Sequence, residues 1–175
     1  MKQKSVMPTA QERVMRENDF IVSKTDLTGR ITYGNQIFQE FAGYSESELL
    51  GKQHNVVRHP DMPRAAFQLV WDTIKAQQEV FAYVINLSRD GSFYWVFAHI
   101  TPSYDRNGKV MGYLSVRRKP RPDAVNVISG IYKQMLDIEK KVGPKEAVAA
   151  SSAFLADFLN EKGASYEEII LALQG

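Results

Sequence analysis

Three strand-like runs joined by two tight turns constrain the fold of this chain more than any other feature. The runs cover residues 80–87, 93–101 and 110–117, and each is rich in β-branched and aromatic side chains. Asp90-Gly91 separates the first two runs and Asn107-Gly108 the last two. Both dipeptides favour hairpins because their turns need positive φ angles. Hairpins join antiparallel neighbours, so these residues predict one antiparallel sheet.

The residues before these runs predict a second hairpin followed by short helices. Residues 20–22 and 31–33 read as strands on either side of turn residues at 26–29. Ser45 and Glu48 match a capping box, in which each side chain binds the other residue's free backbone amide. A longer helix is expected from about residue 63 to 76, because proline is tolerated in a first turn.

That longer helix carries an apolar stripe at helical spacing, which is more typical of plain core than of a cofactor wall. Together with the strands, it predicts an α+β domain: a five-stranded antiparallel sheet with short helices on one face. The stripe consists of Phe67, Val70, Trp71 and Ile74.

The two ends of the chain read as helical additions to this domain. Residues 9–16 favour a short helix, with Thr9 as its N-cap. Residues 117–122 read as a basic, solvated linker. Beyond it, an apolar seam at alternating spacings of three and four predicts an exposed helix face that needs a partner helix. We therefore expect an N-terminal cap segment (residues 1–17), a central α+β domain (18–120) and a C-terminal helical region (121–175). The seam consists of Ile128, Ile131, Met135, Ile138 and Val142.

Composition excludes several function classes. The chain has no cysteine, which excludes disulfides, thiolate metal sites and a photoreceptor that forms a cysteinyl adduct. A net charge of +2 gives no concentrated positive field, so no nucleic-acid partner is expected. No apolar run approaches the roughly 20 residues of a membrane span, and residues 1–10 lack the apolar segment of a secretory signal. The expected location is the cytoplasm.

The densest cluster of chemically versatile side chains lies in residues 54–63, just before the longer helix. Two prolines stiffen this segment, and rigid loops with several hydrogen-bonding groups are common ligand sites. The helix N-terminus beside Arg58 also favours an anion such as a phosphate. In the simpler alternative, Asp61 caps the helix and Arg58 pairs with it. A metal site would use His54, His59, Asp61 and possibly His99, but the spacing matches no strong zinc signature.

Two asparagines interrupt otherwise apolar or turn sequences. Asn86 lies within the strand run Val84-Ile85-Asn86-Leu87, and an inward amide there would imply a polar ligand beside it, because a buried amide must be hydrogen-bonded. An edge or strand-end position is the simpler alternative. Asn35 follows Tyr33 and Gly34 and is a candidate cap for the next helix.

These residues resemble the PAS domain family, and within it the flavin-binding module of Aer-type bacterial aerotaxis receptors. The resemblance covers residues 18–120. Its most specific part is the run His54-Asn55-Val56-Val57-Arg58-His59-Pro60-Asp61-Met62-Pro63, supported by Phe41-Ala42-Gly43-Tyr44 and Gly112-Tyr113-Leu114-Ser115-Val116-Arg117. The 175 residues hold no counterpart of the membrane segment, HAMP region or methyl-accepting rod of such receptors.

The resemblance implies a PAS fold that binds FAD non-covalently and senses redox state or oxygen indirectly, without catalysis. The expected output is a redox-dependent change in the helical tail, with a homodimer through flanking helices and a chemoreceptor or kinase as partner. The alternatives are a heme-binding PAS domain with His59 or His99 as axial ligand, and a ligand-free interaction module. The residues expected to line or support the flavin pocket are Asn35, Arg58, His59, Asp61, Phe67, Trp71 and Asn86.

Overall fold

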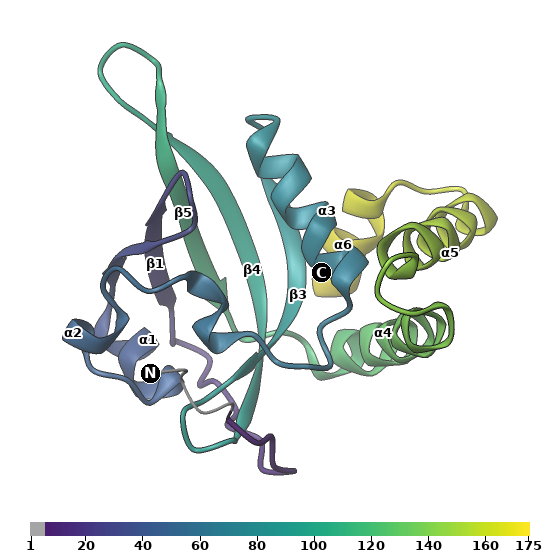
Figure 1. Cartoon of the computed structure of the whole chain (residues 1–175), viewed down its shortest axis with the longest axis horizontal. Helices are drawn as coiled ribbons and strands as arrows, with labels where there is room; N and C mark the ends of the chain where they lie inside the picture. Colours follow the sequence, from purple (N-terminus) through teal and green to yellow (C-terminus); the bar gives the residue numbers. More distant parts are fainter. Residues whose placement is uncertain (1–5) are drawn as a thin grey trace.

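A computed structural model of the chain describes residues 6–175, so the first five residues of the expected N-terminal cap segment lie outside the described part. The centre is a five-stranded antiparallel sheet with the strand order β2-β1-β5-β4-β3 (Figure 1). This confirms the predicted sheet. The strands are β1 (Ile21–Asp26), β2 (Ile31–Gly34), β3 (Val80–Leu87), β4 (Phe93–Tyr104) and β5 (Val110–Arg118).

Short helices cover one face of the sheet, which we call the inner face. Asn35 caps α1 (Gln36–Ala42) by accepting from the amide of Phe38, and α2 (Glu46–Leu49) begins with the predicted capping box. A 3₁₀ segment, η1 (His54–Val57), then leads to α3 (Arg64–Lys75). Alternation along the strands places Val80, Ala82, Tyr94 and Val96 in the apolar clusters on this side.

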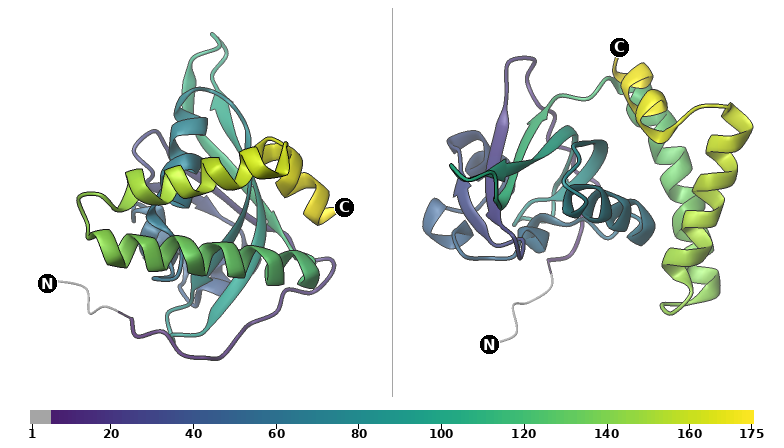
Figure 2. Two further views of the ribbon diagram at one scale, coloured as in Figure 1. Left: turned by 90° about the vertical axis from the view of Figure 1, so that its right-hand side faces the viewer. Right: turned by 90° about the horizontal axis from the view of Figure 1, so that it is seen from above.

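The C-terminal helices cover the opposite, outer face. They are α4 (Pro122–Val142), α5 (Ala147–Lys162) and α6 (Tyr166–Gln174). Figure 2 shows α4 and α5 side by side across the sheet, so that the strands lie between two helical layers. Tyr132 of α4 stacks on Trp95 of β4 and donates its hydroxyl to the carbonyl of Tyr83 at 2.6 Å. The alternate residues of β3 and β4 thus face two different environments.

The prediction that the apolar seam of the tail is exposed is wrong, because other parts of the same chain cover it. Ile128, Ile131 and Met135 are buried in a cluster with Tyr83 and Ile85 of the sheet, and α5 lies beside them. The 3-and-4 spacing correctly indicated a helix with one apolar face. It could not distinguish a partner helix from a sheet face of the same chain, since both bury the same stripe.

Two further expectations are corrected by the sheet. Residues 9–16 form no helix: Glu12 bridges Phe93, and the Thr9 hydroxyl donates to the carbonyl of Gly91 instead of capping. Backbone pairing with the end of the sheet outweighs a weak local helix preference. Arg117 belongs to β5, paired with Ile21, and is buried rather than part of a solvated linker. No helix in residues 6–175 is long and apolar enough to cross a membrane.

Candidate functional site

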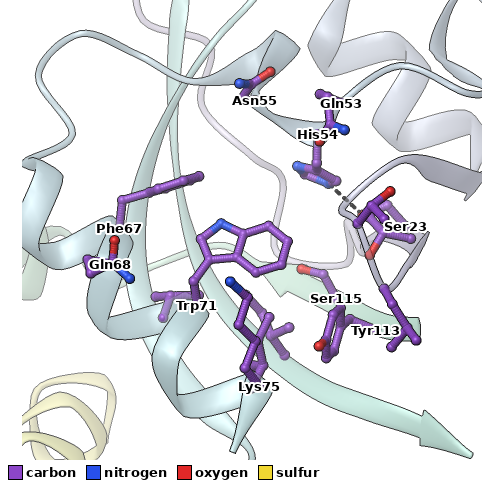
Figure 3. Close-up of a pocket in the computed structure, with 16 residues that line it drawn as sticks. Ser23, Gln53, His54, Asn55, Phe67, Gln68, Trp71, Lys75, Tyr113 and Ser115 are labelled. Atoms are coloured by element: carbon purple, nitrogen blue, oxygen red, sulfur yellow. Dashed lines mark hydrogen bonds between the residues drawn. The ribbon is translucent and has the colours of Figure 1, made fainter. Parts of the chain in front are cut away.

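A cavity of about 440 Å³ lies between α3 and the inner face of the sheet. Figure 3 shows Phe67 and Trp71 projecting from α3 on one side, with Tyr113 and Ser115 of β5 facing them and His54 completing the far wall. The remaining lining residues come from β1 and its turn, η1, α3 and β4: Ser23, Thr25, Leu27, Thr28, Gln53, Asn55, Gln68, Val70, Ile74, Lys75 and Ile100.

The helical wall of the cavity is the apolar stripe predicted from the spacing. Phe67, Val70, Trp71 and Ile74 all line it. Val70 and Ile74 are buried core residues, whereas Trp71 is only partly buried and meets Tyr113 edge-to-face, with ring centroids 5.9 Å apart. The stripe therefore serves both as core and as an aromatic wall, which suits a flat, largely apolar ring.

The sheet side of the cavity carries a polar chain of three residues. Arg117 donates to the hydroxyl oxygen of Ser23, which lies 2.9 Å from Nε2 of His54. Because Ser23 accepts from Arg117, its own proton is free to bind His54, whose Nε2 is then the acceptor. Burial, reinforced by the charge of Arg117, lowers the pKa of His54 to about 3. The imidazole is therefore neutral at physiological pH.

Arg117 is incompletely satisfied. The residue is only 2% exposed, and its Nε has no hydrogen-bond partner. No carboxylate in residues 6–175 forms an ion pair with its guanidinium. The guanidinium lies 4.6 Å from the ring centre of Phe38, and burial lowers its pKa to about 10. A buried cation with an unused donor is costly unless a further acceptor completes it. This side of the cavity therefore suits an acceptor on a ligand.

A smaller extension of about 80 Å³ leads from the cavity to Arg117, Asn86 and Arg58. Asn86 faces inward and is 4% exposed. The Arg58 guanidinium lies 4.3 Å from the ring centre of Phe67, and burial is the main cause that lowers its pKa. Amide and guanidinium thus converge at the inner end of the aromatic wall.

Three of the expected site residues do not line the cavity. Asn35 is fully engaged as a cap: its oxygen accepts from the amides of Val22 and Phe38, and its nitrogen donates to the carbonyl of Phe20. His59 is buried away from the cavity, and its Nδ1 accepts from the amide of Asp61 at 3.0 Å. The Asp61 side chain is 68% exposed. These residues support the surrounding backbone, and contact with a ligand stays a prediction for them.

The expected anion site at the N-terminus of α3 is occupied by the chain itself. Asp61 does not cap this helix and does not pair with Arg58. Instead, Glu139 of α4 accepts from the amides of Arg64 and Ala65. Helix geometry correctly predicted a negative group there, but the group is a carboxylate from 75 residues further along the chain.

A shallow hollow of about 500 Å³ adjoins the cavity and shares Gln53 and Asn55 with it. Arg30 and Lys52 give it two cationic side chains, and both residues are exposed. Arg30 donates to the carbonyl of Gly51, which holds its side chain along the hollow. The cavity thus continues into a basic, open surface.

The histidines do not assemble a metal site. No group of three or more potential metal-ligating side chains is found within residues 6–175. His99 lies on the outer face, stacked on Phe81 with its Nε2 2.6 Å from a carboxylate oxygen of Glu79. Neither His59 nor His99, the proposed axial heme ligands, lines the cavity.

Sequence reasoning missed several lining residues that have no chemical signature of their own. Ser23 and Thr25 of β1, and Ser115 and Arg117 of β5, alternate along strands whose inner side is set by register. Period-two alternation in residues 113–117 was the signal that could have placed Arg117 inside. The run of basic residues after it suggested a linker instead.

Comparison with known proteins places these features in a family. A family model described as PAS fold matches residues 31–117. The aerotaxis receptor of Escherichia coli K12 is 37% identical over 127 residues, which are 73% of this chain and 25% of the receptor. The nitrogen fixation regulatory protein of Klebsiella pneumoniae is 34% identical over 97 residues, which are 55% of this chain and 20% of that protein. The chain thus spans a quarter or less of these relatives.

Solved structures agree with this assignment. A light-oxygen-voltage domain studied with a flavin analogue is 25% identical, with a TM-score of 0.56 over 66% of this chain and 86% of that chain. The light-state structure of the Aureochrome1 light-oxygen-voltage domain has the same fold, at 19% identity and a TM-score of 0.56 over 65% of this chain and 90% of that chain. The chain therefore belongs to the PAS domain family of sensory modules, with its sheet and inner-face helices forming the PAS fold.

Proposed function

We propose that this chain is a redox sensor that binds FAD non-covalently in the inner cavity and passes the redox state of the flavin to its C-terminal helices. The observation that carries the proposal is Arg117, a buried cation with an unused donor beside an aromatic-walled cavity. A flavin is a flat ring with an apolar end and a carbonyl-rich end. The cavity likewise has an apolar, aromatic part and a part lined by hydrogen-bond donors.

The lining residues divide accordingly. Phe67 and Trp71 would cover the ring, whereas Asn86, Arg58 and Arg117 would bind its polar end. The cavity and its extension fall within the range of roughly 300–1,000 Å³ common for small-molecule sites. The chain has no cysteine, so the flavin cannot be attached through a covalent bond to a cysteine sulfur. His54, held neutral, would not compete with Arg117 for an acceptor.

The choice of FAD over FMN rests on the basic hollow next to the cavity. FAD extends FMN by a second phosphate and an adenosine, which need space and cations outside the ring site. Arg30 and Lys52 border such a space, about 500 Å³ in volume. Replacing both Arg30 and Lys52 by glutamate should therefore weaken the binding of FAD, whereas binding of the flavin ring itself should be retained.

When bound, the flavin would supply reversible electron uptake. Asn86 is the residue that can respond, because an amide presents a carbonyl oxygen on one side and an NH₂ group on the other. Rotation of this side chain would exchange its hydrogen bonds and pull on β3, whose outer side meets Tyr132 of α4. A difference of about 1–3 kcal/mol between the two states is enough to bias a two-state element.

The expected output is signalling, without catalysis. A homodimer through flanking helices and a chemoreceptor or kinase partner remain proposals. The apolar seam that they would use is buried against the sheet, so use of it requires the tail to undock. The division at residues 17 and 120 and the cytoplasmic location also stay predictions of the sequence.

The decisive experiment examines the freshly purified 175-residue chain. An absorbance scan should give the paired flavin bands, and chromatography of the cofactor released by heat should identify FAD. A sharp Soret band would establish heme instead. Colourless protein with no extractable nucleotide would overturn the proposal and favour a ligand-free interaction module.

A further inference from the structure

Glu139 is a buried carboxylate of the tail that binds the N-terminus of the pocket helix. Its two oxygens accept from the backbone amides of Arg64 and Ala65 at 3.0 and 3.1 Å, and the residue is 7% exposed. Helix α3 has no side-chain cap of its own, because Pro63 occupies its N-cap position. Glu139 therefore satisfies two otherwise free amides and complements the positive end of the helix.

The same carboxylate also joins the third helix of this region. Ser151 of α5 is fully buried and donates its hydroxyl to Glu139 at 2.6 Å. One side chain of α4 thus holds α3 and α5 together. A displacement of any of these three helices would break charge-assisted hydrogen bonds and leave a buried charge without partners.

Helix α3 reaches from this junction to the cavity. Ala65 and Ala66, in its first turn, contact the tail, whereas Phe67, the next residue, and Trp71, one turn further on, line the cavity. A second link is electrostatic. Glu139 acts to raise the pKa of Arg58, against the stronger lowering by burial and by Arg64. The tail is therefore in contact with the pocket through a helix backbone and through charge.

We propose that Glu139 is a positioning residue that couples the state of the ligand in the inner cavity to the docking of α4–α6 on the sheet. The redox part of this inference rests on the proposed flavin. If two ligand states favour different positions of α3, they must differ in the strength of tail docking. By reciprocity, tail docking then alters the relative stability of the two ligand states.

Docking of α4 on the sheet is already stabilised by the burial of Ile128, Ile131 and Met135. An apolar side chain at position 139 would keep that burial but leave the two amides of α3 and the hydroxyl of Ser151 unpaired. A buried carboxylate with three donors fixes one geometry, because all three hydrogen bonds are made only when α3, α4 and α5 hold these relative positions. This is the property that a coupling between two positions requires.

Hydrogen–deuterium exchange of the 175-residue chain tests the inference. We would compare the wild type, Glu139→Gln and the matched control Glu161→Gln, which lies exposed on α5. In the wild type and the control, exchange in residues 122–174 should differ between oxidised and reduced protein. In Glu139→Gln, these residues should exchange about tenfold faster in both states, the redox difference should disappear, and the midpoint potential should shift.

Retention of the full redox difference and of the wild-type potential in Glu139→Gln would show that the residue is only a structural cap, and the inference would fall. If Glu139→Gln does not fold, Ser151→Ala removes one of the three hydrogen bonds and takes its place, with the same outcomes.

Failure of the flavin proposal is recognised separately, as wild-type protein without flavin. The coupling is then tested in the colourless protein by how far along α3 the faster hydrogen exchange extends. Faster exchange in Glu139→Gln that extends through residues 70–75 beside the cavity supports it. Faster exchange confined to the first turn overturns it.

Discussion

The two faces of the sheet use the same strands but differ in how completely their polar groups are satisfied. On the outer face, the Tyr83 hydroxyl donates to Gln174, and its carbonyl accepts from Tyr132. On the inner face, the Nε of Arg117 and the hydroxyl of Tyr94 are buried without partners. These are the two such atoms found within residues 6–175. The chain therefore supplies partners for the buried polar side chains on the outer face but not for all of those on the inner face.

This difference supports the proposal that the inner face binds a ligand. Buried polar groups in folded proteins are nearly always hydrogen-bonded, and the outer face of this chain follows that rule. Of the two exceptions, Arg117 lines the extension of the cavity, whereas Tyr94 packs in an apolar cluster on the inner face. Substitutions on the outer face should therefore affect stability, and those on the inner face should affect binding.

The largest expected effect is on the outer face. Ile128→Ala should lower the free energy of unfolding by about 2–5 kcal/mol, because Ile128 is 3% exposed in the cluster between α4 and the sheet. Its neighbour Val127 is 46% exposed, so Val127→Ala should change it by less than about 0.5 kcal/mol. Urea unfolding measures both. Equal losses would contradict the docking of the tail.

Replacing the inner cation should produce the opposite pattern. Arg117→Met removes a buried charge that has an unused Nε donor and no countercharge, so ligand-free protein should be as stable as the wild type or more so. Flavin affinity should fall about tenfold to a hundredfold, since hydrogen bonds to charged groups contribute about 1.5–3 kcal/mol. Arg118→Met, at the adjacent exposed position, is the control. Titration of apoprotein with FAD gives the affinities, and undiminished binding by Arg117→Met would remove the argument for an acceptor.

The inner histidine, His54, should make the stability of the protein depend on pH. His54 has a pKa lowered from 6.5 to about 3 in the folded protein, so the unfolded chain binds more protons between these values. Its contribution to stability is therefore complete above pH 6.5 and declines by at most about 1.4 kcal/mol for each pH unit towards pH 3.

Urea unfolding at several pH values should show this decline in the wild type and less of it in His54→Gln. A slope that His54→Gln leaves unchanged would show that His54 is protonated in the folded protein.

The smallest expected effect on binding is at Asn86. Asn86→Ala should retain flavin with an affinity reduced about threefold to tenfold, the equivalent of one neutral hydrogen bond. It should nevertheless separate redox state from tail conformation. Limited proteolysis of the tail in oxidised and reduced protein measures this, and a redox-dependent pattern identical to that of the wild type would refute a switch at Asn86.

Local patterns predicted the parts of the molecule that local interactions stabilise. The hairpin dipeptides at Gly91 and Gly108 need positive φ angles of 90° and 75°, and the strands on either side begin and end within three residues of expectation. The capping box at Ser45 and the face of α3 depend on neighbours within one or two turns. Each of these was therefore visible without the fold.

The errors share one physical cause, which is competition from distant partners. The Thr9 hydroxyl pairs with Gly91, 82 residues away, and the N-terminus of α3 is capped by Glu139. Arg117 looked like the start of a basic linker, but strand register carries it into the interior. Neither the spacing of residues nor the composition indicates which distant group will bind at a given position in the folded chain.

The order of amino acids alone therefore defines an antiparallel sheet with an aromatic helix face beside it, because strand alternation, turn conformation and helix spacing act between near neighbours. Tertiary structure alone decides that the tail closes the outer face, that Glu139 holds the pocket helix, and that Arg117 points into a cavity without a countercharge. Those outcomes depend on which surfaces meet in space, and only the complete packing of the chain determines that.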